Sequence, residues 1–480
     1  MDHNYVIRCP RGTRATWLSA LLTSALACHA AGVSLPAQQT SPSQPATLIL
    51  QHGTLVNPEA RSIPDATVVI QDDRIVCAGP AADCHAPAGV RSVDVRGLYV
   101  SPGLIDAHVH YGQTGWVDGR PDAIDLRSQY RYDSVAGDLA SHPERFHRAD
   151  LCSGVTSVFD VGGFSWTYTI ARRSRNATDA PRVVATGPLL ATIELDPQMM
   201  GQFDFMKNDS TVRAAVRAHR AAGAEALKVW YIEVPDSLQP HAKAMLMAAG
   251  DEARKVGLRL VVHATELARA KEAIEAGAAV LVHGVLTGMV DLEFVAAAKQ
   301  RGTIVIPTLT ALEGYADVFL GRSPAQRYPL DCVDPVTRGK LETILPDTLR
   351  VGGEAFWSGP EAAKLLVTIA ANLRRMYEAG IPIAMGTDAG NPGTAHGSSV
   401  YREMEAMQET GMPARAVFAS ATIVAARAMA LDGDIGSGAA GKRADLVVFG
   451  ADPTADIRNA RQVRFVVRNG VLHTREDLLP

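Results

Sequence analysis

The stretch that decides the fold is YVSPGLIDAHVH, residues 99–110. It is mostly apolar and bounded by turn residues, which is typical of a buried strand. Side chains two positions apart on a strand face the same side, so His108 and His110 can point together at its carboxyl end. Paired imidazoles in this arrangement are ligands that zinc and similar divalent ions accept.

A repeating alternation of strand and helix extends outward from this stretch. The apolar strand candidates are residues 99–110, 156–161, 182–189, 226–231, 258–264, 280–285, 303–309 and 381–388. Segments with helical composition separate most of them, as at 214–222, 242–256 and 267–276. Strands that alternate with helices predict a parallel sheet, and eight such units in roughly 330 residues favour an α/β fold of the (β/α)8 TIM-barrel type.

The sequence pattern at both ends of the chain predicts short strands without intervening helices. Residues 46–100 contain short β-branched strands with turns between them, and two more strand patterns follow at 445–449 and 463–467. A few short strands cannot bury a core alone, so we expect the two pieces to pair in one small β-sandwich. The predicted organisation is a leader at 1–37, β-sandwich at 38–102, barrel at 103–434, and the remaining β-sandwich at 435–480.

The first 37 residues have the charge order of a secretory signal. Arg8, Arg11 and Arg14 precede the apolar run 17–27, and small residues follow it. Ala27, Ala30 and Ala37 are alternative cleavage points, and Leu26-Ala27-Cys28 also allows a lipid anchor on Cys28. We therefore expect an exported protein, either periplasmic or secreted, with a polar linker over residues 38–45.

Composition excludes several classes of protein. A hydrophobic fraction of 47% with 20% charged residues is ordinary for a globular chain and argues against wholesale disorder. The net charge of −4, without a long basic run, disfavours nucleic acid as a partner. No apolar stretch after residue 37 is long enough to span a bilayer. We therefore expect the partner to be a small-molecule substrate. The sequence is compatible with a monomer or a homo-oligomer.

Four cysteines lie beyond the leader, namely Cys77, Cys84, Cys152 and Cys332. An oxidising compartment permits disulfides, and Cys77 and Cys84 flank a Gly79-Pro80 turn closely enough for a local one. The alternative is two small buried residues. The absence of a CxxC pair in the sequence disfavours cysteine ligation of metal.

Polar residues fall at the ends of other predicted strands as well. Lys228 stands inside an apolar strand, His263 and His283 end the fifth and sixth strands, and Asp388 ends the eighth. Catalytic groups of this barrel lie at the carboxyl ends of its strands. The alternative for any lone histidine is a satisfied core position, but four such placements together favour a site.

These residues together resemble the amidohydrolase superfamily, and more narrowly its branch of imidazolonepropionases and metal-dependent Xaa-Pro dipeptidases. The similarity rests on the order HxH, Lys, His, His, Asp, on PGLID at 102–106, and on GKRADLV at 441–447. It implies that His108, His110 and Asp388 bind a buried metal ion, and that His263 and His283 bind an outer one. Lys228 would bridge both ions as a carbamate formed with carbon dioxide.

The resemblance implies a hydrolase with two divalent ions, with zinc as first choice and manganese or iron as alternatives. Hydroxide generated between the ions would attack the substrate, and Asp388 would carry the proton to the leaving nitrogen. A one-metal site in which Lys228 forms a salt bridge with Asp388 stays open.

Other residues have candidate supporting roles. Tyr231 can hydrogen-bond the substrate or the oxyanion, or merely pack at the rim. His396 can contact substrate or orient a ligand. Asp160 and Glu266 lie near strand ends as supporting groups, and Asp106 would orient the first strand.

The leading hypothesis is hydrolysis of an amide or peptide-like C–N bond, in a dipeptide or an N-acyl amino acid. The same site acting on esters, lactones or phosphotriesters is the alternative, and a non-catalytic exported binding protein is a remote one. Lys228 argues against imidazolonepropionase activity, because such sites use one metal without a bridging lysine. The loops after the third and fourth strands, at 187–195 and 229–233, also depart from dipeptidase relatives.

Overall fold

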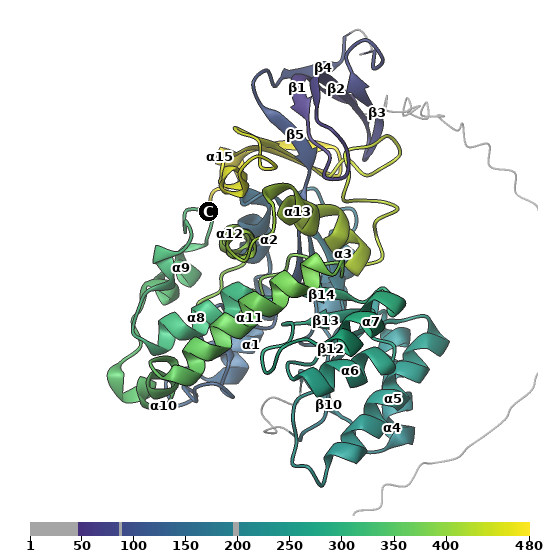
Figure 1. Cartoon of the computed structure of the whole chain (residues 1–480). Helices are drawn as coiled ribbons and strands as arrows, with labels where there is room; N and C mark the ends of the chain where they lie inside the picture. Colours follow the sequence, from purple (N-terminus) through teal and green to yellow (C-terminus); the bar gives the residue numbers. More distant parts are fainter. Residues whose placement is uncertain (1–46, 86–88, 195–200) are drawn as a thin grey trace, which may run out of the picture. The chain divides into compact units, whose positions relative to one another are not determined.

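The computed structural model describes residues 47–85, 89–194 and 201–480 (Figure 1). The predicted leader, the alternative lipid anchor at Cys28 and the linker at 38–45 lie outside the described residues.

Strands from both ends of the chain pair in a single eight-stranded sheet with the order β17-β16-β15-β5-β1-β2-β3, in which β4 also pairs with β1. Its members are β1 (Thr47–Leu55), β2 (Ile63–Gln71), β3 (Arg74–Pro80), β4 (Arg91–Asp94), β5 (Tyr99–Pro102), β15 (Leu446–Phe449), β16 (Val463–Arg468) and β17 (Val471–Thr474). The junction is the antiparallel pairing of β5 with β15, where Val448 faces Val100. The predicted association of the two ends is therefore present, and the two-layer sandwich remains a prediction.

The middle of the chain contains two sheets of parallel strands. One has the order β6-β7-β8, and the other has the order β10-β9-β11-β12-β13-β14. Their strands are β6 (Leu104–Val109), β7 (Val155–Asp160), β8 (Arg182–Ala185), β9 (Leu189–Ala191), β10 (Phe203–Phe205), β11 (Ala226–Trp230), β12 (Arg259–His263), β13 (Val280–Val282) and β14 (Ile304–Ile306). These sheets are not assigned as one closed barrel.

Three predicted strands differ in detail. The first divides into β5 of the end sheet and β6, which lie on either side of residue 103. The seventh ends at Ile306, because Thr308 adopts a left-handed φ of 51° and helix α8 begins at Leu309. The eighth, at 381–388, forms only isolated bridges, Val305 with Ile383 and Val109 with Ala389.

Helices follow most of the parallel strands. They are α1 (Tyr132–Ser141), α2 (Glu144–Cys152), α3 (Thr167–Ser174), α4 (Asp209–Ala222), α5 (Gln239–Val256), α6 (Leu267–Glu275), α7 (Leu292–Arg301), α8 (Leu309–Phe319), α9 (Pro335–Glu342), α10 (Asp347–Trp357), α11 (Pro360–Glu378), α12 (Ser399–Glu409), α13 (Ala414–Ala419), α14 (Ala425–Ala428) and the C-terminal α15 (Arg475–Leu478). The predicted helices at 214–222, 242–256 and 267–276 correspond to α4, α5 and α6 (Figure 1). Among the described helices, none is both long and apolar enough to cross a membrane.

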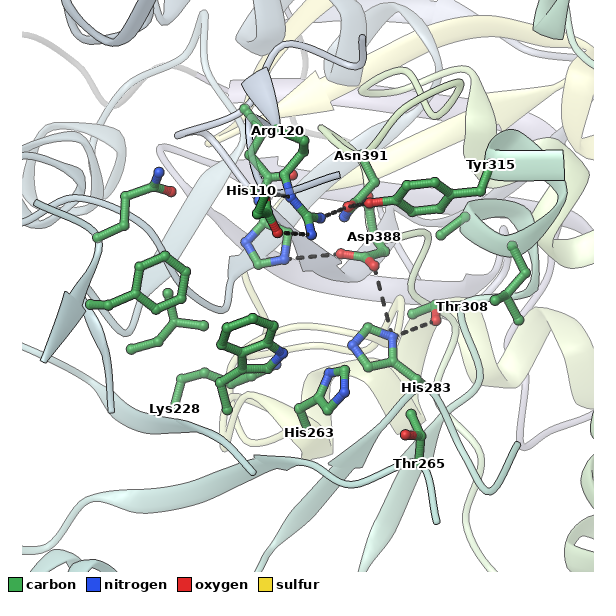
Figure 2. A pocket seen from close by; sticks show the side chains of 18 of the residues that line it. His110, Arg120, Lys228, His263, Thr265, His283, Thr308, Tyr315, Asp388 and Asn391 are labelled. Atoms are coloured by element: carbon green, nitrogen blue, oxygen red, sulfur yellow. Dashed lines mark hydrogen bonds and ion pairs between the residues drawn. The ribbon is translucent and has the colours of Figure 1, made fainter. Parts of the chain in front are cut away.

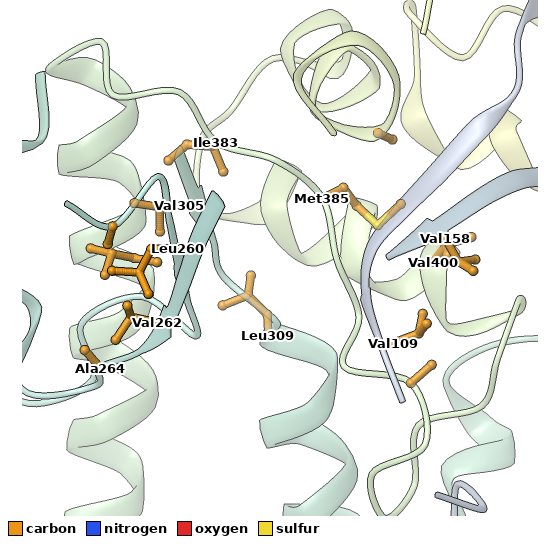
Figure 3. Close-up of a cluster of buried hydrophobic side chains, with 14 of the residues drawn as sticks. Val109, Val158, Leu260, Val262, Ala264, Val305, Leu309, Ile383, Met385 and Val400 are labelled. Atoms are coloured by element: carbon orange, nitrogen blue, oxygen red, sulfur yellow. The ribbon is translucent and has the colours of Figure 1, made fainter. Parts of the chain in front are cut away.

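The parallel strands are buried on both faces, and alternate side chains enter two different apolar clusters. One cluster contains Ile105, Phe159, Val184, Val261, Val282, Ile306 and Ala384. The other packs against helices and contains Val109, Val158, Val183, Val262, Val305, Ile383 and Met385, with Leu309 of α8 and Val400 of α12 (Figure 3). We call these the inner and the outer cluster. Burial on both faces is typical of parallel sheets covered by helices.

Two disulfides join the described cysteines. Cys77 and Cys84 are bonded within the end sheet, at a Cα–Cα distance of 5.7 Å, as one of the two interpretations of their spacing predicted. Cys152 at the end of α2 is bonded to Cys332, which is 180 residues away. The second bond was not predicted, because spacing in the sequence cannot pair cysteines so far apart.

Candidate active site

A cavity of about 230 Å³ opens where several of the parallel strands end (Figure 2). Five of the six predicted ligands line it, namely His110, Lys228, His263, His283 and Asp388. The sixth, His108, is fully buried behind them, with its Nε2 atom 3.2 Å from Asp388 Oδ1. The structure thus brings together side chains that lie within or directly after four strands, and one from the segment that follows residue 381.

The first strand points both of its histidines inward through an irregularity. The pairing of β6 with β7 shifts register between Asp106 and Val109. Ile105 and Ala107 lie in the inner cluster, whereas Val109 lies in the outer one. A bulge of this kind re-aims side chains near active sites, and here it leaves His108 and His110 on the same side.

The three atoms His108 Nε2, His110 Nε2 and Asp388 Oδ1 form a close triangle. The two nitrogens are 3.2 Å apart, and they lie 3.2 and 2.9 Å from the carboxylate oxygen. Ligands about 2.0–2.1 Å from a tetrahedral zinc ion would be roughly 3.3 Å apart. The edges of the triangle are therefore those of a metal coordination shell.

A backbone carbonyl selects the tautomer of His110. Its Nδ1 lies 2.7 Å from the carbonyl oxygen of Gly162, which can only accept a hydrogen bond. In the neutral ring Nδ1 therefore carries the proton and Nε2 keeps a lone pair for a ligand bond. Asp160, predicted as a supporting group, accepts from the amide of Gly162 at 3.4 Å and so holds this carbonyl.

Asp388 lies on a backbone that few residues adopt, with φ of 63°. Asp106 fixes it from behind, because its carboxylate accepts from Thr387 N at 2.9 Å and from Thr387 Oγ1 at 2.6 Å. Asp106 also accepts from His108 N, so it orients both ligand segments, which extends its predicted role. Gly386 permits the close approach, since a Cβ there would lie 2.8 Å from His108 Cβ.

The two outer histidines lie side by side. The rings of His263 and His283 have centroids 4.5 Å apart, and His283 Nδ1 is 2.8 Å from Thr308 Oγ1. His283 follows the inward-facing Val282 and would point outward by strand alternation, but its φ of 76° turns it to the cavity. Left-handed backbone at His283, Thr308 and Asp388 together is typical of strain held at a functional site.

Burial sets the charge of these groups. It lowers the pKa of His108 to about 3 and the pKa values of His263 and His283 well below the usual range, so the rings are neutral. Burial likewise lowers the pKa of Lys228 to about 7, against the opposing attraction of Asp388. Neutral imidazoles and a lysine that loses its proton near neutrality are the states that metal ligation requires.

The donor set fits a divalent metal ion. Asp388 Oδ1 is buried and has no hydrogen-bond partner among the residues that the structure describes. His108, His283 and Asp388 offer ligand atoms within 4.8 Å of one another. A buried polar atom without a partner is costly, and a cation bound to this oxygen would remove that cost.

Tyr231 does not reach this cavity, which corrects its expected contact with substrate. Val229 and Tyr231 belong to the outer cluster, and the tyrosine hydroxyl donates to Glu272 Oε2 at 2.6 Å and accepts from Gln239 Nε2 at 2.8 Å. The alternation along β11 places Lys228 and Trp230 in the cavity instead. The alternative packing role agrees with these contacts.

His396 and Glu266 also lie outside the lining of the cavity. His396 stacks on Phe146 at 4.1 Å, and its Nε2 lies 3.3 Å from the carbonyl oxygen of His110. This placement matches the orienting role and not the contact with substrate. Glu266 precedes α6, and it accepts from Thr265 Oγ1 at 3.1 Å.

Several residues that line the cavity were not predicted from the sequence. Arg120 comes from the segment after the first strand, Tyr315 comes from α8, and Asn391 follows Asp388 by three positions. Trp230 and Phe203 complete an aromatic wall, with centroids 5.4 Å apart. Of these residues, only Trp230 could have been predicted, because it lies two positions after Lys228 and therefore on the same face of the strand.

Glu403 of α12 positions the helix that lines one wall. Its fully buried carboxylate accepts from Leu309 N at 3.0 Å through Oε1 and from Thr310 N at 2.7 Å through Oε2. These amides start α8, whose preceding residue Thr308 makes no side-chain cap because its hydroxyl contacts His283. Glu403 thus supplies the missing cap from another helix.

Glu403→Gln is expected to lower the free energy of unfolding by about 1–3 kcal/mol, because a carboxamide has one oxygen and leaves one buried N–H without an acceptor. Chemical denaturation measures the change. Glu361→Gln on the exposed side of α11 is the matched control and should stay within about 0.5 kcal/mol. An equal, small effect at both positions would refute this capping role.

Comparison with known proteins identifies the family to which the chain is similar. A family model described as the amidohydrolase family matches residues 99–472. An imidazolonepropionase from Rhizorhabdus wittichii is 27% identical over 444 residues, which cover 86% of this chain and 93% of that protein.

Solved structures share the fold. A Xaa-Pro dipeptidase with methionine bound in its active site has a TM-score of 0.67 and 24% identity, and the match covers 89% of this chain and 100% of that chain. A molinate hydrolase has a TM-score of 0.68 and 21% identity, with coverage of 90% and 96%.

Proposed function

Because this chain belongs to the amidohydrolase family and is a hydrolase acting on carbon–nitrogen bonds, we propose that it cleaves an amide or peptide-like bond at a site for two metal ions. The observation that carries this proposal is the convergence of His108, His110 and Asp388 beside the buried Lys228. The favoured substrates are dipeptides or N-acyl amino acids.

For the fold, we propose that the two parallel sheets are arcs of one (β/α)8 barrel. Backbone hydrogen bonds from Ala384 N to Val305 O and from Ala107 N to Met385 O link β14 through residues 381–389 to β6. On the other side, Glu225 N donates to Ala185 O, which links β8 to β11. The single inner cluster with members from both sheets supports this closure.

The proposed ligands divide into two groups. His108, His110 and Asp388 would hold the buried ion, His263 and His283 the outer one, and Lys228 both. Imidazole and carboxylate ligands favour zinc, with manganese or iron as alternatives. When bound, the ions supply Lewis acidity, which eases deprotonation of a water molecule and polarises the scissile carbonyl.

Asp388 would carry the proton between the two halves of the reaction. Its Oδ1 faces the histidines of the first strand, and its Oδ2 lies 3.8 Å from His283 Nδ1. Oδ2 would take the proton of the attacking water and later return it to the leaving nitrogen as the C–N bond breaks. The hydrogen bonds between Asp106 and Thr387 hold the backbone segment that carries this carboxylate.

Lys228 would act as a carbamate. A protonated lysine would repel two cations, whereas a carbamate is an anion with two oxygens that can span them. Only the neutral amine reacts with carbon dioxide, and burial lowers the pKa of Lys228 to about 7, so this form is available at neutral pH.

We expect reconstitution of the metal-depleted enzyme to require bicarbonate and, when the concentration of dissolved carbon dioxide is held constant, to become faster between pH 6 and 8. The sign follows from lysine chemistry, because the reactive neutral fraction grows as the pH rises through the pKa. The regain of activity is followed after zinc is added with and without bicarbonate. A rate that is independent of bicarbonate at every pH would contradict the carbamate.

The function itself is tested by assaying amide cleavage with the metal-loaded enzyme. We expect release of free amine from N-acyl amino acids or Xaa-Pro dipeptides, loss of this release with a chelator, and its return with added zinc. Turnover of aryl esters only, or turnover that a chelator leaves unchanged, would contradict the proposal.

We also propose that the protein is exported to the periplasm or secreted. The basic, apolar and small residues of the first 37 positions support this, and so do two disulfides in the described part, which are typical of oxidising compartments. The mass of the mature protein distinguishes cleavage before a lipid-modified Cys28 from cleavage after Ala30 or Ala37. Recovery of the unprocessed chain from the cytoplasm would contradict export.

A further inference from the structure

The cavity has a polar wall next to Asp388, which contains Arg120, Tyr315 and Asn391. Asn391 Nδ2 donates to the carbonyl oxygen of Asp388 at 3.1 Å, and Asn391 Oδ1 accepts from Tyr315 OH at 2.9 Å and from Arg120 Nη1. Figure 2 shows Arg120, Asn391 and Tyr315 gathered on the Asp388 side, away from Lys228 and His263. A cationic group is therefore built into the wall beside the proposed proton carrier.

Arg120 is held rigidly but keeps donors to spare. Its Nε and Nη2 donate to the two oxygens of Asp122 at 2.8 and 2.6 Å, and Nη1 donates to Asn391. These contacts use three of the five N–H groups of a guanidinium. One N–H group on each terminal nitrogen is left, and these two groups can donate to the oxygens of a carboxylate.

The opposite wall is apolar and begins at the outer histidines. Trp230 meets the ring of His263 edge-on at 6.2 Å, and Phe203 lies 5.4 Å from Trp230. Leu189 and Leu286 extend this wall. It offers contact to a hydrocarbon or aromatic group and no hydrogen-bonding charge.

The acidic groups of the cavity lie on its Arg120 side, away from the apolar wall. Among the described residues, the carboxylates that line the cavity are Asp122 and Asp388. Asp122 is paired with Arg120, and Asp388 faces His108 and His110. A free α-amine entering beside the apolar wall would lose its hydration without gaining a partner, which is costly.

We propose that the substrates are N-acyl amino acids with an apolar acyl group, rather than dipeptides with a free amino end. Arg120, supported by Tyr315 and Asn391, binds the carboxylate of the amino-acid half, and the wall of Trp230 and Phe203 receives the acyl group. Hydrolysis breaks the C–N bond between the halves, so the hydroxyl of water goes to the acyl carbon and its proton to the nitrogen. This assignment rests on the proposed function and narrows its substrate class.

The test uses matched sets built on alanine, leucine and phenylalanine: the N-hexanoyl amino acid, its carboxamide, and the leucyl dipeptide with a free amine. For the metal-loaded wild type we expect kcat/KM at least about 100-fold higher for the acid than for the carboxamide, because an arginine pairs only with the former. The dipeptide should be at least about tenfold poorer than the N-hexanoyl acid, because its amine is buried without a partner.

Arg120→Gln should remove this preference, lowering kcat/KM about 100-fold for the acid and less than about threefold for the carboxamide. Arg131→Gln, at an exposed ion pair with Asp133, is the control and should change neither value. Tyr315→Phe is the second variant if Arg120→Gln folds poorly, and it should weaken selectivity for the acid in the same direction.

Binding to the metal-loaded Asp388→Asn protein, measured by calorimetry, separates the two levels of the proposal. Tighter binding of the acid without any amide turnover by the wild type would overturn the proposed function and leave Arg120 as the carboxylate site. Amide turnover with equal preference for acid and carboxamide, or with the dipeptide preferred, would overturn the substrate class and leave the proposed function standing.

Discussion

Replacing Asp388 by Asn is expected to reduce kcat by at least about 1,000-fold, because the variant loses the group that accepts and returns the proton. The carboxamide is nearly the same size as the carboxylate, so the protein should stay folded. Thr387 and Asp106 still hold the segment from behind. The expected signature is therefore a large loss of turnover with an unchanged circular dichroism spectrum and melting temperature.

Asp236→Asn, which changes an exposed carboxylate before α5, is the matched control and should leave kcat unchanged. The decisive measurement is single-turnover kinetics of Asp388→Asn with the best amide substrate. A variant that retains metal and keeps its rate within about tenfold would show that the proton moves through another group.

The second large effect is expected for Lys228→Ala. Removing the proposed bridge should lower kcat/KM by at least about 100-fold. Substitution of a residue that only supports a metal ligand already lowers activity by about 10–100-fold, and loss of a ligand should cost at least as much. The space left by the side chain is enclosed, because Lys228 is only 1% exposed. Added propionate or acetate should enter it, replace the two oxygens of the carbamate, and restore part of the activity.

Rescue distinguishes a bridge from a structural lysine, since a small carboxylate cannot repair a packing defect. Lys299→Ala on the exposed face of α7 is the control, and neither its activity nor any response to propionate should differ from the wild type. If Lys228→Ala stays fully active, or is inactive without any rescue while retaining two metal ions, the bridging role is wrong.

Much of the site was predictable because strand alternation is a strict local rule. Lys228 and His263 lie two positions after the inward-facing Ala226 and Val261, as the period of a strand requires. The same rule, applied fully, would have selected Trp230 and excluded Tyr231. The error at Tyr231 came from treating proximity in sequence as a shared face.

Other features depend on backbone conformations that alternation cannot supply. His283 reaches the cavity only through a left-handed φ, and Val109 faces outward because of the register shift in β6. The pattern at 381–388 predicts a strand, but this segment forms only isolated bridges. Gly386 allows it to lie close against the first strand.

Long-range pairings were beyond reach for a different reason. Arg120 is positioned in the cavity by a hydrogen bond to Asn391, which is 271 positions away. Cys152 forms a disulfide with Cys332, which is 180 positions away. One sequence contains no information on which of many polar residues in connecting segments will meet. The residues of the proposed substrate-binding wall could therefore be identified only in the structure.

The central claim is that six side chains hold two metal ions, and an anomalous difference map from crystals of the zinc-loaded enzyme tests it most directly. We predict two peaks about 3.5–4 Å apart. One should lie against His108, His110 and Asp388 and the other against His263 and His283, with density beyond Lys228 Nζ reaching both. A single peak, or none among these residues, would contradict it.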